Sequence, residues 1–106
     1  MGPSKTIEKI GEYKGYKFCI LRMPMGWLNG YIQIPETSRF YNRDYNDISL
    51  YCIDLTYSDY LKELDNKYCI GWDHMGDLYS MSDKTTVEEV EEECHEVIDS
   101  LIRLNV

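Results

Sequence analysis

The segment that restricts the fold most is an amphipathic helix predicted over residues 86–103. Thr85 and Glu88 have the spacing of a capping box, which marks the start of a helix. Apolar residues then recur at helical intervals: Val87, Val90, Cys94, Val97, Ile98 and Leu101. Such a stripe is stable only when another element covers it, so the rest of the chain must supply a packing surface.

The preceding residues favour a sheet. Strand-forming residues dominate segments 6–13 and 16–23, which flank the turn candidate Lys14-Gly15 and are predicted to form a hairpin. Further strands are predicted at residues 31–34, 48–55 and 68–72, and one helical turn within residues 59–66. Segment 48–55 is mostly apolar on both faces, which is typical of a central strand.

The predicted fold is therefore α+β: a mainly antiparallel sheet of about four to five strands with one long C-terminal helix packed on it. A single domain is expected over residues 6–106. Residues 1–5 are small and polar, and we expect them to be a disordered N-terminus or a remnant of cloning.

Four cysteines, Cys19, Cys52, Cys69 and Cys94, include no Cys-x-x-Cys pair. Three lie in apolar strand-like runs and the fourth on the apolar face of the helix, so all four are predicted to be buried free thiols. A metal site and a bound cofactor are not predicted. Reduced cysteines favour a cytoplasmic location.

The formal net charge of −8 limits the partners of the chain. Such a charge repels phosphate backbones, so direct nucleic-acid binding is not expected. No apolar stretch approaches the roughly 20 residues of a membrane span, so a membrane partner is not expected either. A basic protein groove, by contrast, would attract this surface through electrostatic steering.

Acidic residues crowd the polar side of the predicted helix. Seven carboxylates fall within twelve residues: Glu88, Glu89, Glu91, Glu92, Glu93, Glu96 and Asp99. One interpretation is a solvated face that the helix dipole partly stabilises. The other is a phosphate-mimicking face that docks on a basic groove through Glu89, Glu92, Glu93 and Glu96.

A second candidate site is the segment Asp73-His74-Met75-Gly76-Asp77, which directly follows a predicted strand. His74 is a candidate general base or ligand, with Asp73 and Asp77 beside it. The structural alternative is a histidine that caps a turn and hydrogen-bonds Asp73. Sequence motifs of nucleophile elbows, phosphate-binding loops or zinc proteases do not occur, so no catalytic residue is predicted.

Aromatic residues add further candidates. Trp27 lies in an apolar loop with a proline and glycines, where it either folds back onto the core or forms an exposed binding anchor. The chain has ten tyrosines, and Tyr57 belongs to a group in the middle of the sequence. These tyrosines either pack on the sheet or line a recognition surface that could stack a nucleobase.

Four segments in order resemble a family of small phage and prophage proteins: Gly30-Tyr31-Ile32-Gln33-Ile34-Pro35, Asp44-Tyr45-Asn46-Asp47-Ile48, Leu55-Thr56-Tyr57-Ser58 and Ile70-Gly71-Trp72-Asp73-His74-Met75-Gly76-Asp77. The family has a histidine and two glycines where this chain has Cys52-Ile53-Asp54, and its aspartate-to-histidine segment is two residues longer. The resemblance carries over Asp73, His74, Gly76 and Asp77. It implies an accessory gene of a phage or mobile element, acting in the host cytoplasm.

Three hypotheses follow. The first is a non-enzymatic counter-defence inhibitor, similar in role to an anti-CRISPR protein, that binds a nucleic-acid-handling host defence protein through its acidic, tyrosine-rich surface. The second is a protein that sequesters or degrades a small nucleotide immune signal at Asp73, His74 and Asp77. The third is an oligomeric structural or assembly subunit with residues 23–28 in its interface.

Overall fold

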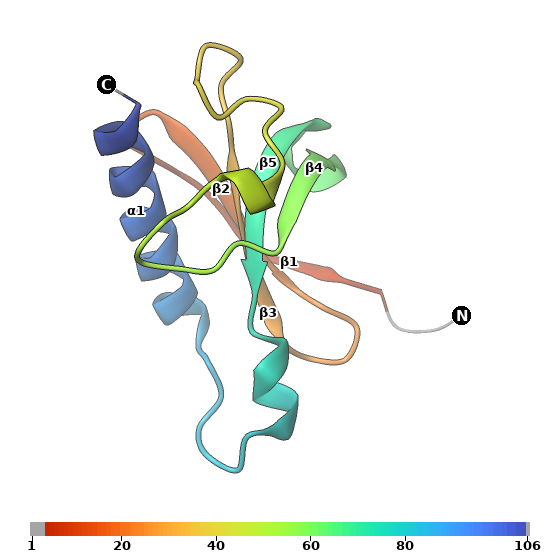
Figure 1. Cartoon of the computed structure of the whole chain (residues 1–106). Coiled ribbons are helices and arrows are strands. Elements are labelled where there is room, and N and C mark those ends of the chain that lie inside the picture. The colour runs from red at the N-terminus through yellow and green to blue at the C-terminus, as the bar shows by residue number, and fades with distance from the viewer. Residues whose placement is uncertain (1–3, 106) are drawn as a thin grey trace.

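The first three strands form a continuous antiparallel meander. β1 (Thr6–Tyr13) and β2 (Tyr16–Arg22) are joined at Lys14 and Gly15, both of which have positive φ, as the tightest hairpin turns require. β3 (Leu28–Gln33) pairs with β2. The computed structural model describes residues 4–105 and confirms the predicted hairpin (Figure 1).

Two later strands complete a five-stranded antiparallel sheet of order β1-β2-β3-β5-β4. β5 (Lys67–Asp73) pairs with β3, and β4 (Tyr57–Leu61) forms the other edge. Short 3-10 turns occupy Tyr45–Asp47 (η1), Lys62–Leu64 (η2) and Met75–Tyr79 (η3). The turn predicted within residues 59–66 is therefore confirmed at η2, although residues 59–61 belong to β4.

The central strand predicted at residues 48–55 is wrong. The middle strand of the sheet is β3, and residues 48–55 form an irregular connection that pairs with no strand. Ile48 and Leu50 are buried while Ser49 and Tyr51 are exposed. Apolar residues of both predicted faces pack against the main core from this irregular segment: Ile48 and Leu50 are buried in it, and Ile53 and Leu55 lie partly buried beside it. This explains the error, because two apolar faces also occur without strand pairing.

The long helix α1 (Val87–Leu104) is confirmed, with a boundary shifted by one residue. Thr86, rather than Thr85, is the N-cap, and its capping-box partner is Glu89 rather than Glu88. Thr85 is unsuited to this role because its backbone N–H already donates to the Asp77 carboxylate at 2.9 Å. The α+β fold predicted from the sequence is thus the fold observed.

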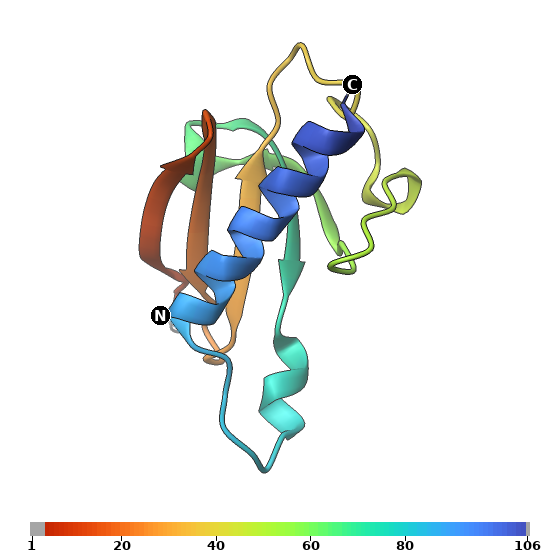
Figure 2. The ribbon, with the colours of Figure 1, turned by 90° about the vertical axis from the view of Figure 1, so that its left-hand side faces the viewer.

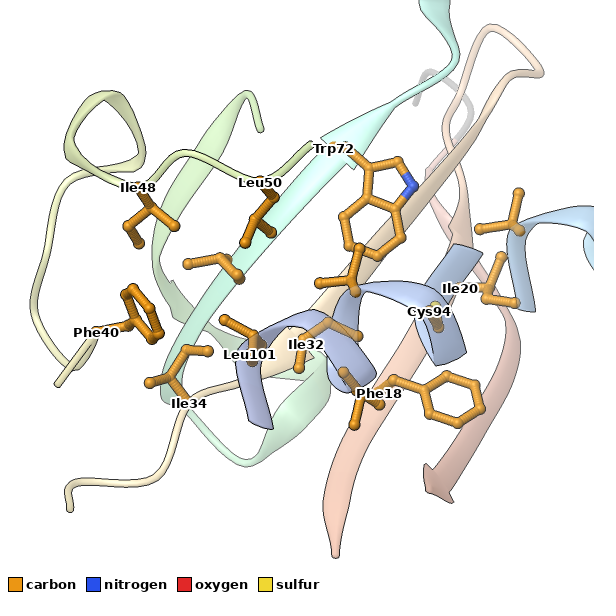
Figure 3. Packing of buried hydrophobic residues seen from close by; sticks show 14 of the residues in the cluster. Phe18, Ile20, Ile32, Ile34, Phe40, Ile48, Leu50, Trp72, Cys94 and Leu101 are labelled. Carbon is orange, nitrogen blue, oxygen red and sulfur yellow. The ribbon is translucent and has the colours of Figure 1, made fainter. Parts of the chain in front are cut away.

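The main core lies between α1 and one face of the sheet, here called the helix face. Figure 2 shows α1 running obliquely across the strands. Figure 3 shows its apolar side chains meeting those of the sheet and of the 34–55 connection. The cluster is built from Phe18, Ile20, Leu28, Ile32, Ile34, Phe40, Ile48, Leu50, Tyr68, Ile70, Trp72, Val90, Cys94, Val97, Ile98 and Leu101.

A second, smaller cluster lies on the opposite face of the sheet, here called the outer face. Its buried members are Cys19, Leu21, Tyr31, Leu61, Leu64 and Cys69. Leu64 comes from η2, which folds over this side of the sheet. Strands β2, β3 and β5 are therefore buried on both faces, whereas most residues of β1 are exposed.

Three of the four cysteines are buried as predicted, and all four are free. The prediction is wrong for Cys52, which is exposed because it lies in the irregular connection rather than in a strand.

The expected N-terminal disorder or cloning remnant falls mainly on residues 1–3, outside the described residues; Lys5 is described and pairs with Glu63 at 3.5 Å. No helix in the described chain has the length and apolar character to cross a membrane.

Candidate functional site

The segment after β5 is tied to α1 through one carboxylate. Glu93 Oε1 accepts the Trp72 indole N–H at 3.0 Å and lies 2.7 Å from His74 Nε2. Trp72 is buried, and the side chains of His74 and Glu93 are 21% and 25% exposed. This carboxylate therefore faces the sheet rather than the solvent side of α1, where the sequence had placed it.

The environment of His74 favours its protonated form. The hydrogen bond with Glu93 raises the pKa of His74 above its ordinary value of 6.5, while partial burial acts in the opposite direction. Nδ1 of the same ring lies 3.4 Å from the Thr85 hydroxyl. Both ring nitrogens thus have protein partners, an arrangement that suits a structural histidine better than a general base.

The two aspartates of the segment are also engaged in hydrogen bonds. Asp73 accepts the Thr56 hydroxyl at 2.8 Å and the Met75 backbone N–H at 3.1 Å, which brings together two of the segments that carry the phage-family resemblance. Asp77 accepts the Thr85 backbone N–H, and this bond lowers the pKa of Asp77. Asp73 does not pair with His74 as the structural alternative had proposed.

Next to this segment lies a cleft of about 390 Å³, between the β2–β3 loop and residues 77–85. Trp27, Leu28 and Leu78 supply apolar wall, and Arg22, Asp77 and Lys84 supply charge. The structure thereby brings Trp27 and Asp77 to one site. Within residues 4–105, the buried Trp27 indole N–H has no hydrogen-bond acceptor.

The cations of the cleft differ in how they are held. Arg22 donates to the Glu8 carboxylate at 3.1 Å and to the Gly26 carbonyl at 2.9 Å. Lys84 donates to the backbone carbonyls of Asp77 and Ser80 and forms no ion pair with a described carboxylate. The Lys84 charge is therefore the one more available to an anionic ligand.

The acidic residues of α1 divide into two groups. Glu91 pairs with Lys9 at 2.6 Å, Asp99 pairs with Lys14 at 2.8 Å, and Glu89 closes the capping box. Glu88, Glu92 and Glu96 are all exposed. They lie on the same side of the helix because each is four residues from the next. We call Glu88, Glu92 and Glu96 the acidic ridge.

Tyr57 belongs to the outer-face cluster rather than to an exposed surface. Its ring packs edge-on against Tyr31 with centroids 5.2 Å apart, and its hydroxyl donates to the Tyr60 carbonyl at 2.9 Å. Burial raises the pKa of Tyr57 to about 12. Among the tyrosines, Tyr51 and Tyr79 are the most exposed.

The sequence did not single out Arg22, Lys84 or Thr85 for the cleft, or Glu88 for the ridge. Glu88 could have been found from its four-residue spacing to Glu92, but the cleft unites segments about fifty residues apart and had no local signal.

In the described part of the chain, no group of three or more His, Cys, Asp or Glu side chains is arranged to hold a metal ion. Comparisons with protein families, curated proteins and solved structures find no match to this chain.

Proposed function

We propose that the chain is a non-enzymatic inhibitor that binds a basic groove of a nucleic-acid-handling protein through the acidic ridge of α1. The observation that supports this most is the geometry of Glu88, Glu92 and Glu96. They are exposed, and none forms an ion pair with another described residue. With a helical rise of 1.5 Å per residue, successive members are about 6 Å apart, roughly twice the axial spacing of phosphates along one DNA strand.

Rigidity of the ridge also favours this function. α1 is held to the sheet by its apolar stripe and by ion pairs from Lys9 and Lys14 to Glu91 and Asp99. A rigid row of charges loses little conformational entropy on binding, so more of the electrostatic attraction contributes to affinity. The two lysines also neutralise acids at the flank and leave the ridge as the main line of negative charge on the helix.

The expected partner is a host defence protein that handles nucleic acid, as in anti-CRISPR inhibition. This part of the proposal rests on the sequence resemblance to small phage and prophage proteins. A net charge of −8 would accelerate encounter with a basic groove and make the affinity depend strongly on salt.

The test is charge reversal with a matched control. The variant Glu88→Lys/Glu92→Lys/Glu96→Lys avoids Glu89 and Glu93, which have structural roles. Its control is Glu36→Lys/Asp54→Lys/Asp83→Lys, which makes the same change in net charge at exposed positions outside α1. Purified defence nucleases from hosts of such elements are assayed for cleavage with each variant. Loss of inhibition in the ridge variant alone supports the proposal, and full inhibition by that variant refutes it.

A second candidate function is the binding of a small nucleotide signal, and the cleft favours it. A base could stack on the Trp27 indole while Lys84 and Arg22 face the phosphate. Because His74 and Asp73 are engaged internally, this version places the ligand beside the Asp73–Asp77 segment rather than on it. Calorimetry with cyclic nucleotides and ADP-ribose derivatives tests this function. The Lys84→Gln variant should bind the nucleotide more weakly, whereas Lys62→Gln, at an exposed position outside the cleft, should bind it as the native chain does. Flat titrations across the panel would exclude this function.

A further inference from the structure

β1 is an edge strand with two half-exposed apolar side chains, Ile7 and Ile10. It pairs with β2 on one side only. Ile7 is 49% exposed and Ile10 is 53% exposed, both near the outer-face residues Leu21 and Cys19. A free strand edge offers unpaired backbone groups to another strand, and exposed isoleucines add apolar area to such a contact.

A β-bulge brings the two isoleucines to the same face. The register shifts between Ile7 and Lys9, so that Ile7 lies opposite Leu21 and Ile10 lies opposite Cys19. Without the extra residue, side chains three positions apart would point to opposite faces of the sheet. The bulge therefore creates a small apolar patch on the outer face along the free edge.

The charges of β1 and of Lys5, the residue just before it, are arranged symmetrically about this patch. We propose that two copies of the chain pair through β1, antiparallel, about a twofold axis between Glu8 and Lys9. Opposite residues in that arrangement are Lys5 with Glu12, Ile7 with Ile10, and Glu8 with Lys9 of the second copy. Two of these three pairs join opposite charges and the third joins apolar side chains, which stabilises cross-strand pairing, while Thr6 lies opposite Gly11 without a like-charge contact.

The faces of the sheet agree with this register, because residues directly opposite in an antiparallel pair point to the same face. Ile10 and Glu12 line a cleft with Glu63, the residue that pairs with Lys5, so these side chains share the outer face.

Glu8 and Lys9 lie instead on the helix face, where they pair with Arg22 and Glu91. In the dimer, the contact of Glu8 with Lys9 of the second copy extends these pairs into a row of alternating charge.

The other sheet edge lacks this symmetry. Asp59 is the middle residue of β4 (Tyr57–Leu61), so pairing the whole strand with its own copy would set two aspartates opposite each other. β1 is therefore the edge that fits a second copy of this chain. The axis runs perpendicular to the sheet, which places both α1 helices on one face of a continuous ten-stranded sheet.

Sedimentation equilibrium and light scattering test this arrangement directly. The native chain should show a concentration-dependent mass that approaches twice 12.6 kDa. Lys5→Glu alone, or Glu12→Lys alone, replaces two attractive cross-strand pairs by repulsive ones and should raise the dimer dissociation constant about tenfold or more. Asp54→Lys, an exposed change of the same size and sign as Glu12→Lys, should leave the dissociation constant unchanged.

Mixing provides the decisive measurement. The Lys5→Glu chain and the Glu12→Lys chain are each self-repulsive, yet their opposite charges meet in a heterodimer, so an equimolar mixture should regain the native affinity. Ile10→Thr, which keeps strand propensity but removes apolar area, should weaken the native dimer. A chain that stays monomeric at millimolar concentration, or a dimer that neither charge change affects, would overturn the proposal. Neither result bears on the acidic ridge, which lies on α1.

Discussion

His74 Nε2 and Glu93 Oε1 lie 2.7 Å apart, and the same Glu93 oxygen accepts the indole N–H of Trp72. One carboxylate thus links the core of the sheet, the segment after β5 and the long helix. The contact holds the Asp73–Asp77 segment beside the cleft together with the hydrogen bonds that Asp73 accepts from Thr56 and Asp77 accepts from Thr85. It also explains why one acid of a glutamate-rich helix is absent from its solvent side.

Removal of the Glu93 carboxylate should destabilise the protein. Glu93→Ala leaves the buried Trp72 N–H and the His74 ring without their acceptor, at a cost of about 1–3 kcal/mol in the free energy of unfolding. Glu92→Ala, on the exposed side of the same helix, should change it by less than about 0.5 kcal/mol. Urea denaturation of the two variants and the native chain gives the comparison. Equal effects would show that the Glu93 contact contributes nothing.

The His74–Glu93 contact should make stability depend on pH. Because the pKa of His74 is raised in the folded state, its stabilisation is full below the ordinary value of 6.5 and is lost as pH rises through the folded-state pKa. The difference in unfolding free energy between the native chain and His74→Gln should therefore shrink from about pH 6 to pH 9. Urea denaturation across that range measures it.

An NMR titration of the His74 ring provides an independent check. Its midpoint should lie above 6.5 in the native chain and fall in Glu93→Gln, while Glu92→Gln should leave it unchanged. A native midpoint at or below 6.5 would contradict the effect assigned to Glu93.

Gly30 should not tolerate a side chain. A methyl group there would lie 2.5 Å from Trp72 Cζ2, because the indole packs directly on the glycine across the β3–β5 pair. Gly30→Ala should cost about 1–3 kcal/mol through overpacking. Gly76→Ala is the control: its new methyl group meets no described atom within 4 Å, so stability should hold or rise slightly. Thermal unfolding of both variants decides, and a neutral Gly30→Ala would be inconsistent with this packing.

Thiol reactivity should separate Cys52 from the other cysteines. Cys52 is exposed, whereas Cys19, Cys69 and Cys94 are buried. Burial raises the pKa of Cys19 and of Cys69 to about 12, and raises the pKa of Cys94 as well, so few thiolates form at neutral pH. An Ellman assay on the native chain should titrate one thiol rapidly and all four in denaturant. Rapid modification of the Cys52→Ser variant in the absence of denaturant would contradict this assignment.

Elements with a local signal were predictable from the sequence. The hairpin at Lys14-Gly15 and the helix over Val87–Leu104 rest on turn chemistry, capping and a periodic stripe, all of which act within a few residues. The error at residues 48–55 has the opposite origin. An extended segment becomes a strand only if another strand, often distant in the sequence, pairs with it. In this sheet the central strand β3 pairs with β2 on one side and β5 on the other, which leaves no place beside it for residues 48–55.

The candidate site was less predictable because its parts converge only in three dimensions. Sequence reasoning named Trp27, Asp77, His74 and Glu93, but it assigned them to three separate features. The structure pairs His74 with Glu93 and places Trp27 and Asp77 in the lining of one cleft. Contacts of this kind join residues about fifty positions apart for the cleft and nineteen for the ion pair, so no local pattern encodes them.

The order of elements along the chain has a consequence for biosynthesis. The apolar helix face is complete once β5 has left the ribosome, yet α1, which covers much of it, is translated afterwards. Until then the nascent sheet leaves Phe18, Ile32 and Trp72 without the cover that α1 provides in the folded chain. Stable folding therefore waits for α1 to emerge, and a chain that ends before Val87 would keep one apolar face of its sheet uncovered.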